Sequence, residues 1–217
     1  MLHGFTGNIL HVDLTNRTLE IENPDEEFYR HYPGGSLLGL YYLWHNTPAH
    51  ADPLSPANTL TFALSAPTGL PVSGQSRCTV TCKSPSSGGV ADTIVITGAS
   101  DTPVYLWLHD GEAELRDASH LWGKPTLEVD TILQDEIGDQ RIEIAQIGPA
   151  GEKLANFAAI MNMSNRAWGR TGVGAVMGSK KLKAIVVRGT QKVNPADKKA
   201  VTELSKQGAK GFPGSGM

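Results

Sequence analysis

The segment from Asn165 to Lys180 has the composition of a loop that binds an anionic group. It contains Arg166 and Arg170, no acidic side chain, and glycines at positions 169, 172, 174 and 178. Glycine lets the backbone approach a ligand and adopt positive φ, and exposed backbone N–H groups form concave anion sites. Arginine adds a planar charge that binds phosphate through two donors. The segment therefore predicts a cradle for a phosphorylated cofactor, with glycines that only make tight turns as the alternative.

Two common phosphate motifs are excluded by spacing. No Gly-Lys-Ser/Thr triplet closes the segment as a Walker loop requires. The run Gly169–Gly172 does not follow a strand and open a long helix, as a dinucleotide-binding fingerprint would.

Catalytic and metal-binding patterns are missing from the sequence. The seven histidines are scattered, with no Ser/His/Asp or metal-binding His/Glu spacing, and we interpret them as surface or packing residues. Cys78 and Cys82 would share one face of a strand. An iron–sulfur cluster typically needs four ligands, so packing is the favoured role for these two thiols.

Composition narrows the class of protein. A chain of 217 residues suits one or two domains and buries a substantial core. Its net charge of −3 disfavours broad nucleic-acid binding, which needs a basic stripe. No apolar run approaches the ~18 residues of a membrane span. Polar Gly4, Thr6 and Asn8 occupy the place of a signal peptide's apolar block, so a cytoplasmic location is predicted.

The elements that must position the loop occur twice along the chain. Each half reads as a hairpin, a helix, a strand that ends in a Pro/Gly turn, a further strand and a closing strand. In the first half these fall at 7–21, 37–44, 59–69, 78–82 and 93–97, and in the second at 104–115, 127–137, 141–151, 156–160 and 183–187. We predict an α+β fold of two packed β-sheets with few helices and a pseudo-two-fold internal repeat.

The repeat suggests where the two candidate arginine loops lie. If the loops around Arg77 and Arg166 are equivalent, they converge on one face near the pseudo-two-fold axis. Residues 1–197 are expected to form this domain. Residues 198–217 have the composition of a linker or of the start of a following domain.

Several motifs together resemble one family. The run Gly169–Ile185 resembles the amino-terminal domain of tungsten-containing aldehyde ferredoxin oxidoreductases. Four further runs are similar to that domain, in the same order and at similar spacing from about residue 4 to residue 197: Gly7–Thr15, Asp52–Pro56, Arg116–Lys124 and Ile147–Glu152.

The resemblance implies a cofactor and the residues that bind it. Family members carry tungsten, or molybdenum in some relatives, on two pterin dithiolenes whose phosphates are bridged by Mg²⁺. The backbone carbonyl of Ala167 matches a magnesium ligand. The implied cofactor-binding residues are Arg77, Gly88, Gly89, Arg166, Ala167, Trp168, Gly169, Arg170, Gly172 and Gly174.

Alternatives stand beside some of these assignments. Arg77 read without the family is an ordinary rim arginine on a strand. Trp168 either stacks on a pterin ring or only packs the loop. Lys180, Lys181 and Lys183 are interpreted as a solvated face rather than as phosphate ligands.

The sequence departs from the family after Pro85. The family has a longer segment there, with an Asn-Ser-Gly-Gly element whose asparagine supplies the second magnesium carbonyl. Here we interpret Ser87-Gly88-Gly89 as the remnant of that element, and the asparagine has no clear counterpart. Either the protein lacks the element or a loop is absent from this sequence. The shortfall puts the pterin contacts of the first half in question.

The function implied by the resemblance is oxidation of an aldehyde to a carboxylate, with electrons passing through a 4Fe-4S cluster to ferredoxin. The cluster ligands and acid–base residues belong to later domains, so this chain is expected to supply no catalytic residue and to be inactive alone. Expected partners are the aldehyde, ferredoxin and those later domains, and homo-oligomerisation stays open. The alternatives are a same-family reductase of a carboxylate or aromatic thioester, and a non-catalytic module that has lost the cofactor.

Overall fold

A computed structural model describes residues 5–66, 68, 70, 72, 78–85, 94–162, 166–190 and 195–211. The first half begins with the hairpin of β1 (Ile9–Asp13) and β2 (Thr18–Glu22), whose turn is fixed by hydrogen bonds from the backbone N–H groups of Thr15 and Asn16 to the Asp13 carboxylate. The hairpin is followed by α1 (Glu26–His31), α2 (Gly35–Asn46), β3 (Thr61–Ala63), β4 (Thr79–Thr81) and β5 (Val95–Thr97).

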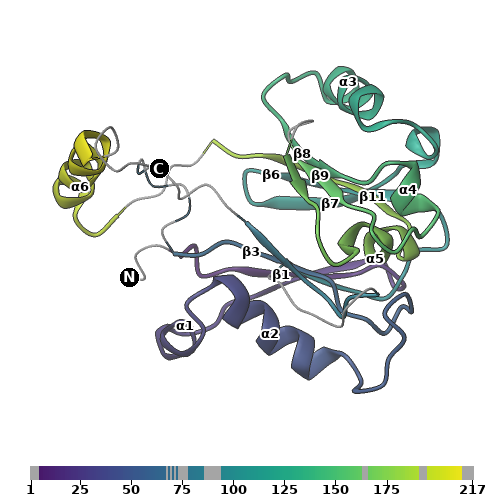
Figure 1. The fold of residues 1–217 in the computed structure, drawn as a ribbon, viewed down its shortest axis with the longest axis horizontal. Coiled ribbons are helices and arrows are strands. Elements are labelled where there is room, and N and C mark those ends of the chain that lie inside the picture. Colours follow the sequence, from purple (N-terminus) through teal and green to yellow (C-terminus); the bar gives the residue numbers. More distant parts are fainter. Residues whose placement is uncertain are drawn as a thin grey trace.

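The second half begins with a second hairpin, of β6 (Val104–His109) and β7 (Glu112–Asp117). The chain continues through η1 (Ser119–Leu121), α3 (Thr126–Ile137), β8 (Glu143–Gln146), α4 (Pro149–Glu152), β9 (Ile160–Asn162), β10 (Arg166–Trp168), α5 (Val173–Ser179) and β11 (Leu182–Arg188). A last helix, α6 (Lys198–Gly211), stands apart from the sheets (Figure 1) and has no buried residue among those described.

The strand order confirms the internal repeat. In the first half the order is β2-β1-β5, with β1 and β5 parallel, and in the second it is β7-β6-β11, with β6 and β11 parallel. On the far side of the closing strand, β5 bonds antiparallel to the segment that enters β3, through Leu60 and Ile96, and β3 pairs with β4. Likewise β11 pairs antiparallel with β8, which pairs with β9. Each half thus repeats one five-strand order.

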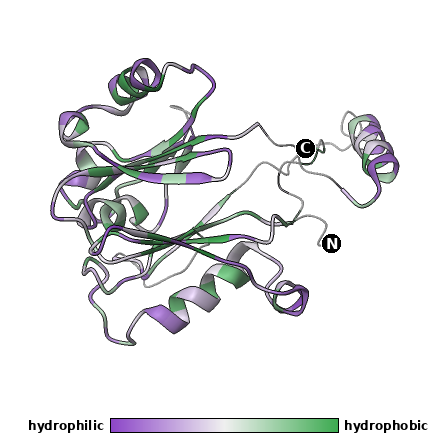
Figure 2. Ribbon diagram, turned by 180° about the vertical axis from the view of Figure 1, so that it is seen from behind, coloured by the Kyte–Doolittle hydropathy of each residue, from purple (hydrophilic) through white to green (hydrophobic). Residues whose placement is uncertain are grey.

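The two sheets pack face to face between helices. In Figure 1, α2 lies on the outer side of the β1–β3 layer and α3 lies beyond the layer of β6–β11. The largest core cluster joins both layers, and Figure 2 shows the matching hydrophobic colouring on the strands. From the first half it includes Val12, Leu60 and Ile96, and from the second Leu106 and Ile185. The predicted α+β class with two packed sheets is confirmed.

Two strand predictions need adjustment. The strand expected at 156–160 begins only at Ile160, because Ala158 closes a turn by donating its N–H to the carbonyl of Ala155. The strand expected at 78–82 is the shorter β4, and the two cysteines flank it. Cys82 belongs to the main core cluster and Cys78 packs against it, so the packing role predicted for both is confirmed.

No helix within the described ranges is both long enough and apolar enough to cross a membrane.

Candidate anion-binding site

The segment Arg166–Gly172 runs from a strand into a helix, so the expectation that Gly169–Gly172 follows no strand is wrong. The helix that it opens has only seven residues and is not the long helix of a dinucleotide-binding fingerprint. Strand β10 pairs with β9 at the edge of the six-stranded sheet, and the chain then turns through Thr171 (φ +63°) and Gly172 (φ +74°) to start α5. Along this loop Arg166, Ala167, Gly169 and Arg170 are exposed. The structure therefore presents both arginines and the Ala167 backbone to solvent, on a loop with defined anchors at its two ends.

Trp168 has an identified packing role. Its indole N–H donates to the carbonyl oxygen of Cys78 at 2.8 Å, and its ring meets Phe62 edge-on with centroids 6.1 Å apart. The ring also packs against the main core cluster. Of the two roles considered from the sequence, the structure shows the packing of the loop.

Gly172 and Gly174 are buried, and each allows a close approach between backbones. A Cβ at Gly172 would overlap the carbonyl oxygen of Asn156, and one at Gly174 would lie 2.5 Å from the carbonyl oxygen of Ala159. These two glycines position α5 against the chain leading into β9. Their predicted contact with a cofactor stays a prediction, whereas Gly169 is open, with only the Cβ of Ala167 nearby at 3.8 Å.

The same close packing continues along α5 at Gly178. A Cβ there would overlap the carbonyl oxygen of Gly151 in α4. We expect Gly178→Ala to lower the free energy of unfolding by about 1–3 kcal/mol, since two helix backbones would have to separate. Gly208→Ala is the matched helical control, because a Cβ at Gly208 in α6 meets nothing within 4 Å. Urea unfolding measures both variants, and a Gly178→Ala protein as stable as its control would contradict the packing argument.

The predicted solvated face of lysines is wrong for two of its three members. Lys180 and Lys183 are fully buried. The Lys180 ammonium donates to the carbonyl oxygens of Gly98 at 2.7 Å and Pro56 at 3.3 Å. Burial lowers its pKa to about 8. These contacts join α5 to the first half of the chain, so Lys180 holds the two halves together.

Lys183 forms a buried ion pair. Its ammonium lies 2.5 Å from Glu152 Oε1 and 3.1 Å from the carbonyl oxygen of Lys124, while Glu152 Oε2 accepts from the N–H of Gly123 at 2.8 Å. Burial is the main cause that lowers the pKa of Lys183. Three of the sequence runs that resembled the family meet here, and these contacts between them are structural. The sequence does contain an indication of this burial, since Lys183 stands between Leu182 and Ala184 in an otherwise apolar strand.

Three predicted site residues, Arg77, Gly88 and Gly89, lie outside the described residues and stay predictions. The strand order nevertheless corrects the expected equivalence of the two arginine loops. Strand β4 corresponds to β9, yet Arg77 precedes β4 and Arg166 follows β9. The counterpart of the connection that carries Arg166 is instead the one after β4, in which Gly88 and Gly89 fall.

Two other sets of titratable groups in the described part lie on other elements than the loop. His109, Glu112 and Glu114 place one donor atom each within 4.8 Å of the others, but they lie at the tip of the β6–β7 hairpin, where Glu114 already pairs with Arg116. The Cys82 thiol is buried, which raises its pKa to about 12 and makes it a poor nucleophile.

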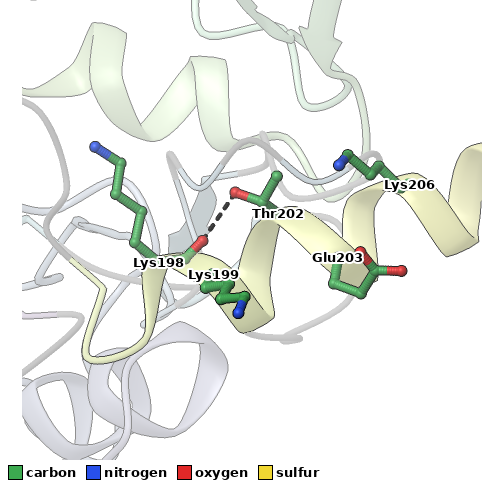
Figure 3. A pocket seen from close by; sticks show the side chains of 5 residues that line it. All are labelled: Lys198, Lys199, Thr202, Glu203 and Lys206. Carbon is green, nitrogen blue, oxygen red and sulfur yellow. Dashed lines mark hydrogen bonds between the residues drawn. The ribbon is translucent and has the colours of Figure 1, made fainter.

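A hollow on α6 is likewise separate from the loop. Figure 3 shows it lined by five residues of that single helix, with the lysine side chains pointing in different directions and Thr202 bonded to the Lys198 carbonyl. It contains no residue of the Arg166–Gly172 loop.

The fold and the loop together define an α+β domain with a duplicated strand order that presents a basic loop at a sheet edge. Residues 9–189 match the model of the aldehyde ferredoxin oxidoreductase N-terminal domain. The chain belongs to this family.

Similar proteins include enzymes whose names describe different activities. The chain is 43% identical over 223 residues to a tungsten-containing aldehyde ferredoxin oxidoreductase of Pyrococcus abyssi, covering 95% of this chain and 37% of that protein. It is 31% identical over 221 residues to an aliphatic sulfonate oxidoreductase, WOR-like subunit, of Pyrococcus furiosus, covering 87% and 35%. The active-site complex BamBC of benzoyl coenzyme A reductase, solved with 1,5-dienoyl-CoA, matches with a TM-score of 0.91 and 32% identity over 99% of this chain and 35% of that one. The chain thus spans little more than a third of each relative.

Proposed function

We propose that this chain is the cofactor platform of a tungsten (or molybdenum) bis-pterin oxidoreductase that oxidises aldehydes to carboxylates. The observation that supports the proposal most is the exposed loop Arg166–Arg170, held between buried anchors in a chain whose family includes tungsten-containing enzymes. When bound, the metal would supply the two-electron chemistry, and this domain would supply binding and electrostatics.

The residues of the loop fit the proposed group. Two exposed guanidinium groups, at Arg166 and Arg170, suit phosphate arms, which are costly to desolvate without cationic partners. Ala167 lies on an edge strand of the described sheet, where backbone groups on the outer side have no neighbouring strand to pair with. A carbonyl oxygen in that position is a suitable ligand for Mg²⁺. Gly169 leaves room for a ligand to approach the backbone.

The remaining parts of the proposal concern the whole protein. Residues 1–197 form the platform domain, and residues 198–217 lead to later domains that hold the 4Fe-4S cluster and the acid–base residues. Ferredoxin accepts the electrons, the enzyme is cytoplasmic, and a homo-oligomer is compatible with this arrangement.

A reductase of the same family is the second candidate. The likeness to a benzoyl coenzyme A reductase complex, at a TM-score of 0.91, supports a chain that works on an aromatic thioester or a carboxylate. Both candidates use the same platform, because the substrate would meet the metal and the later domains.

Analysis of tungsten, molybdenum and phosphorus in the purified full-length protein tests the platform. Roughly two pterin phosphates per metal atom support it. Metal-free protein from tungstate-supplemented cells would instead identify a module that has lost the cofactor. Separate activity assays with an aldehyde and with benzoyl coenzyme A then distinguish the two enzymatic candidates.

Arg166→Ala is expected to weaken cofactor retention about ten- to a hundredfold. Removing a hydrogen bond to a charged group costs roughly 1.5–3 kcal/mol. Tungsten and pterin content after dialysis of the full-length protein measures the loss. Arg30→Ala is the matched control, since Arg30 pairs with Glu26 on α1 and belongs to no loop of the proposed site. Equal cofactor content in both variants would count against a phosphate contact at Arg166.

A further inference from the structure

Two hydrogen bonds tie Trp168 and Thr171 of the Arg166–Gly172 loop to the other half of the chain. Trp168 Nε1 donates to the carbonyl oxygen of Cys78 at 2.8 Å, and Ser84 Oγ donates to the carbonyl oxygen of Thr171 at 2.5 Å. The partners lie 90 and 87 residues apart in sequence. Cys78 and Ser84 flank β4, while Trp168 and Thr171 flank the exposed pair Gly169-Arg170. The exposed pair Gly169-Arg170 is therefore held on both sides, while the exposed Arg166 and Ala167 precede Trp168 and pair with β9.

The first-half side of this arrangement is hydrogen-bonded to a buried asparagine. Asn58 is fully buried, and its side-chain amide exchanges hydrogen bonds with the backbone N–H and carbonyl of Lys83, both at 2.8 Å, beside Ser84. A further bond at 2.6 Å joins the same amide to the carbonyl oxygen of Pro53. Ser84 is thus anchored through its neighbour, and its own side chain is almost fully buried.

The Trp168 side has equivalent support. The indole packs against Phe62 on β3, and Phe62 is the register partner of Val80 on β4. The ring therefore contacts β3, and the N–H bonds to the residue that precedes β4. At the other end of the loop, the Cγ of Pro85 occupies the space beside Gly172, where a Cβ would come within 2.9 Å of it.

We propose that Trp168 and Ser84 are positioning residues that fix the conformation of the Arg166–Arg170 loop before a ligand binds. A loop with glycines at 169 and 172 has much conformational freedom to lose, and ordering it beforehand removes that cost from binding. The pair acts through the loop backbone, so neither side chain needs to touch the ligand. The consequence for phosphate binding rests on the function proposed above, whereas the loop's order does not.

Hydrogen exchange of the 217-residue chain tests the order of the loop directly. Trp168→Phe keeps an aromatic ring and removes the donor, and Ser84→Ala removes the hydroxyl. We expect amides of residues 166–172 to exchange about two- to tenfold faster in either variant, the factor that the loss of one neutral hydrogen bond corresponds to. Amides of β6 and of α3 should keep their rates. Unchanged exchange over 166–172 in both variants overturns the proposal.

Matched controls separate this effect from general destabilisation. Trp44→Phe changes a tryptophan that is 85% exposed, and Ser55→Ala removes a hydroxyl that bonds to the Asp52 carbonyl at an exposed turn. Both should leave residues 166–172 unaffected. Equal acceleration of the whole domain in Trp168→Phe and Ser84→Ala would also overturn the proposal, because it would show a global loss of stability.

Calorimetric titration with inorganic pyrophosphate gives the second readout. The two positioning variants should bind about two- to tenfold more weakly than the parent and the two controls. Parent-like affinity in both variants, despite a faster-exchanging loop, contradicts positioning for binding. If the parent chain does not bind pyrophosphate but exchange changes as expected, the anion site is refuted, while the role of Trp168 and Ser84 in ordering the loop is supported.

Discussion

Glu152→Ala is expected to lower the free energy of unfolding by about 3–5 kcal/mol, since it leaves the buried Lys183 ammonium without its counter-charge. The side chains of Lys183 and Glu152 are 0% and 4% exposed. Lys183→Met should have a similar cost, because it leaves the carboxylate buried with only the N–H of Gly123 as an identified donor. Urea unfolding followed by circular dichroism measures both losses.

The double variant Lys183→Met/Glu152→Leu distinguishes a charge effect from lost packing. Replacing both partners by apolar residues removes the unpaired charge, so its stability should exceed that of either single variant. Glu26→Ala is the surface control: Glu26 pairs with Arg30 in the open, and its loss should not be measurable. Additive losses in the double variant would refute the proposed coupling between Lys183 and Glu152.

The free energy of unfolding of the parent protein, measured relative to that of Lys180→Met, is expected to increase with pH by up to about 3 kcal/mol. One pKa unit corresponds to about 1.4 kcal/mol. Burial lowers the folded-state pKa of Lys180 to about 8 from the ordinary lysine value of 10.5. Between these two values the unfolded chain binds more protons than the folded one, so raising the pH favours the folded state. Below about pH 8 the full penalty for burying the charge is present, and above about 10.5 it has disappeared.

The comparison with Lys180→Met isolates this one group. Cys82 titrates in the opposite sense, since its raised folded-state pKa lowers stability as the pH rises from about 9 to about 12. Because the Lys180 charge itself lowers the pKa of Cys82, this contribution cancels only below about pH 9, and that range gives the clean part of the difference. Urea midpoints at intervals from pH 7 to 10.5 provide the curve. A flat difference would show that the carbonyl oxygens of Gly98 and Pro56 keep the ammonium charged without penalty.

The sequence predicted most of the fold because hairpins and amphipathic helices have local signals. The pattern of Leu37, Leu38 and Tyr41 placed α2, and that of Val129, Leu133 and Ile137 placed α3. The prediction of a strand at 156–160 was wrong over most of its length, because the apolar residues Phe157 and Ala158 lie in a turn that packs against α5. The pairing of distant glycines with backbone carbonyls, which causes that packing, has no local signature.

The sequence indicated the loop of the candidate site but not the contacts that hold this loop in place. Arginine and glycine types pointed to residues 166–174, and the structure leaves both arginines exposed. The roles of Lys180 and Lys183 were missed, since a run of lysines after a helix usually means a solvated face. Ser84 was missed because only the folded chain brings it to Thr171, 87 residues away. The hydrophobic periodicity of the sequence does not encode contacts between the two halves of the chain.

The shared core of the two halves also has a consequence for how the chain folds. Strand β1 pairs in parallel with β5, and β6 with β11, so each half closes a long loop: His11 meets Val95, and Leu106 meets Ile185. Non-local parallel pairing of this kind makes folding slow, because chain entropy is lost before the contacts that offset it form. Core residues of the first half, such as Val12 and Leu60, complete their burial only against the second. During synthesis the first half therefore leaves the ribosome with an apolar sheet face uncovered, and its vulnerability to aggregation lasts until β11 has been made.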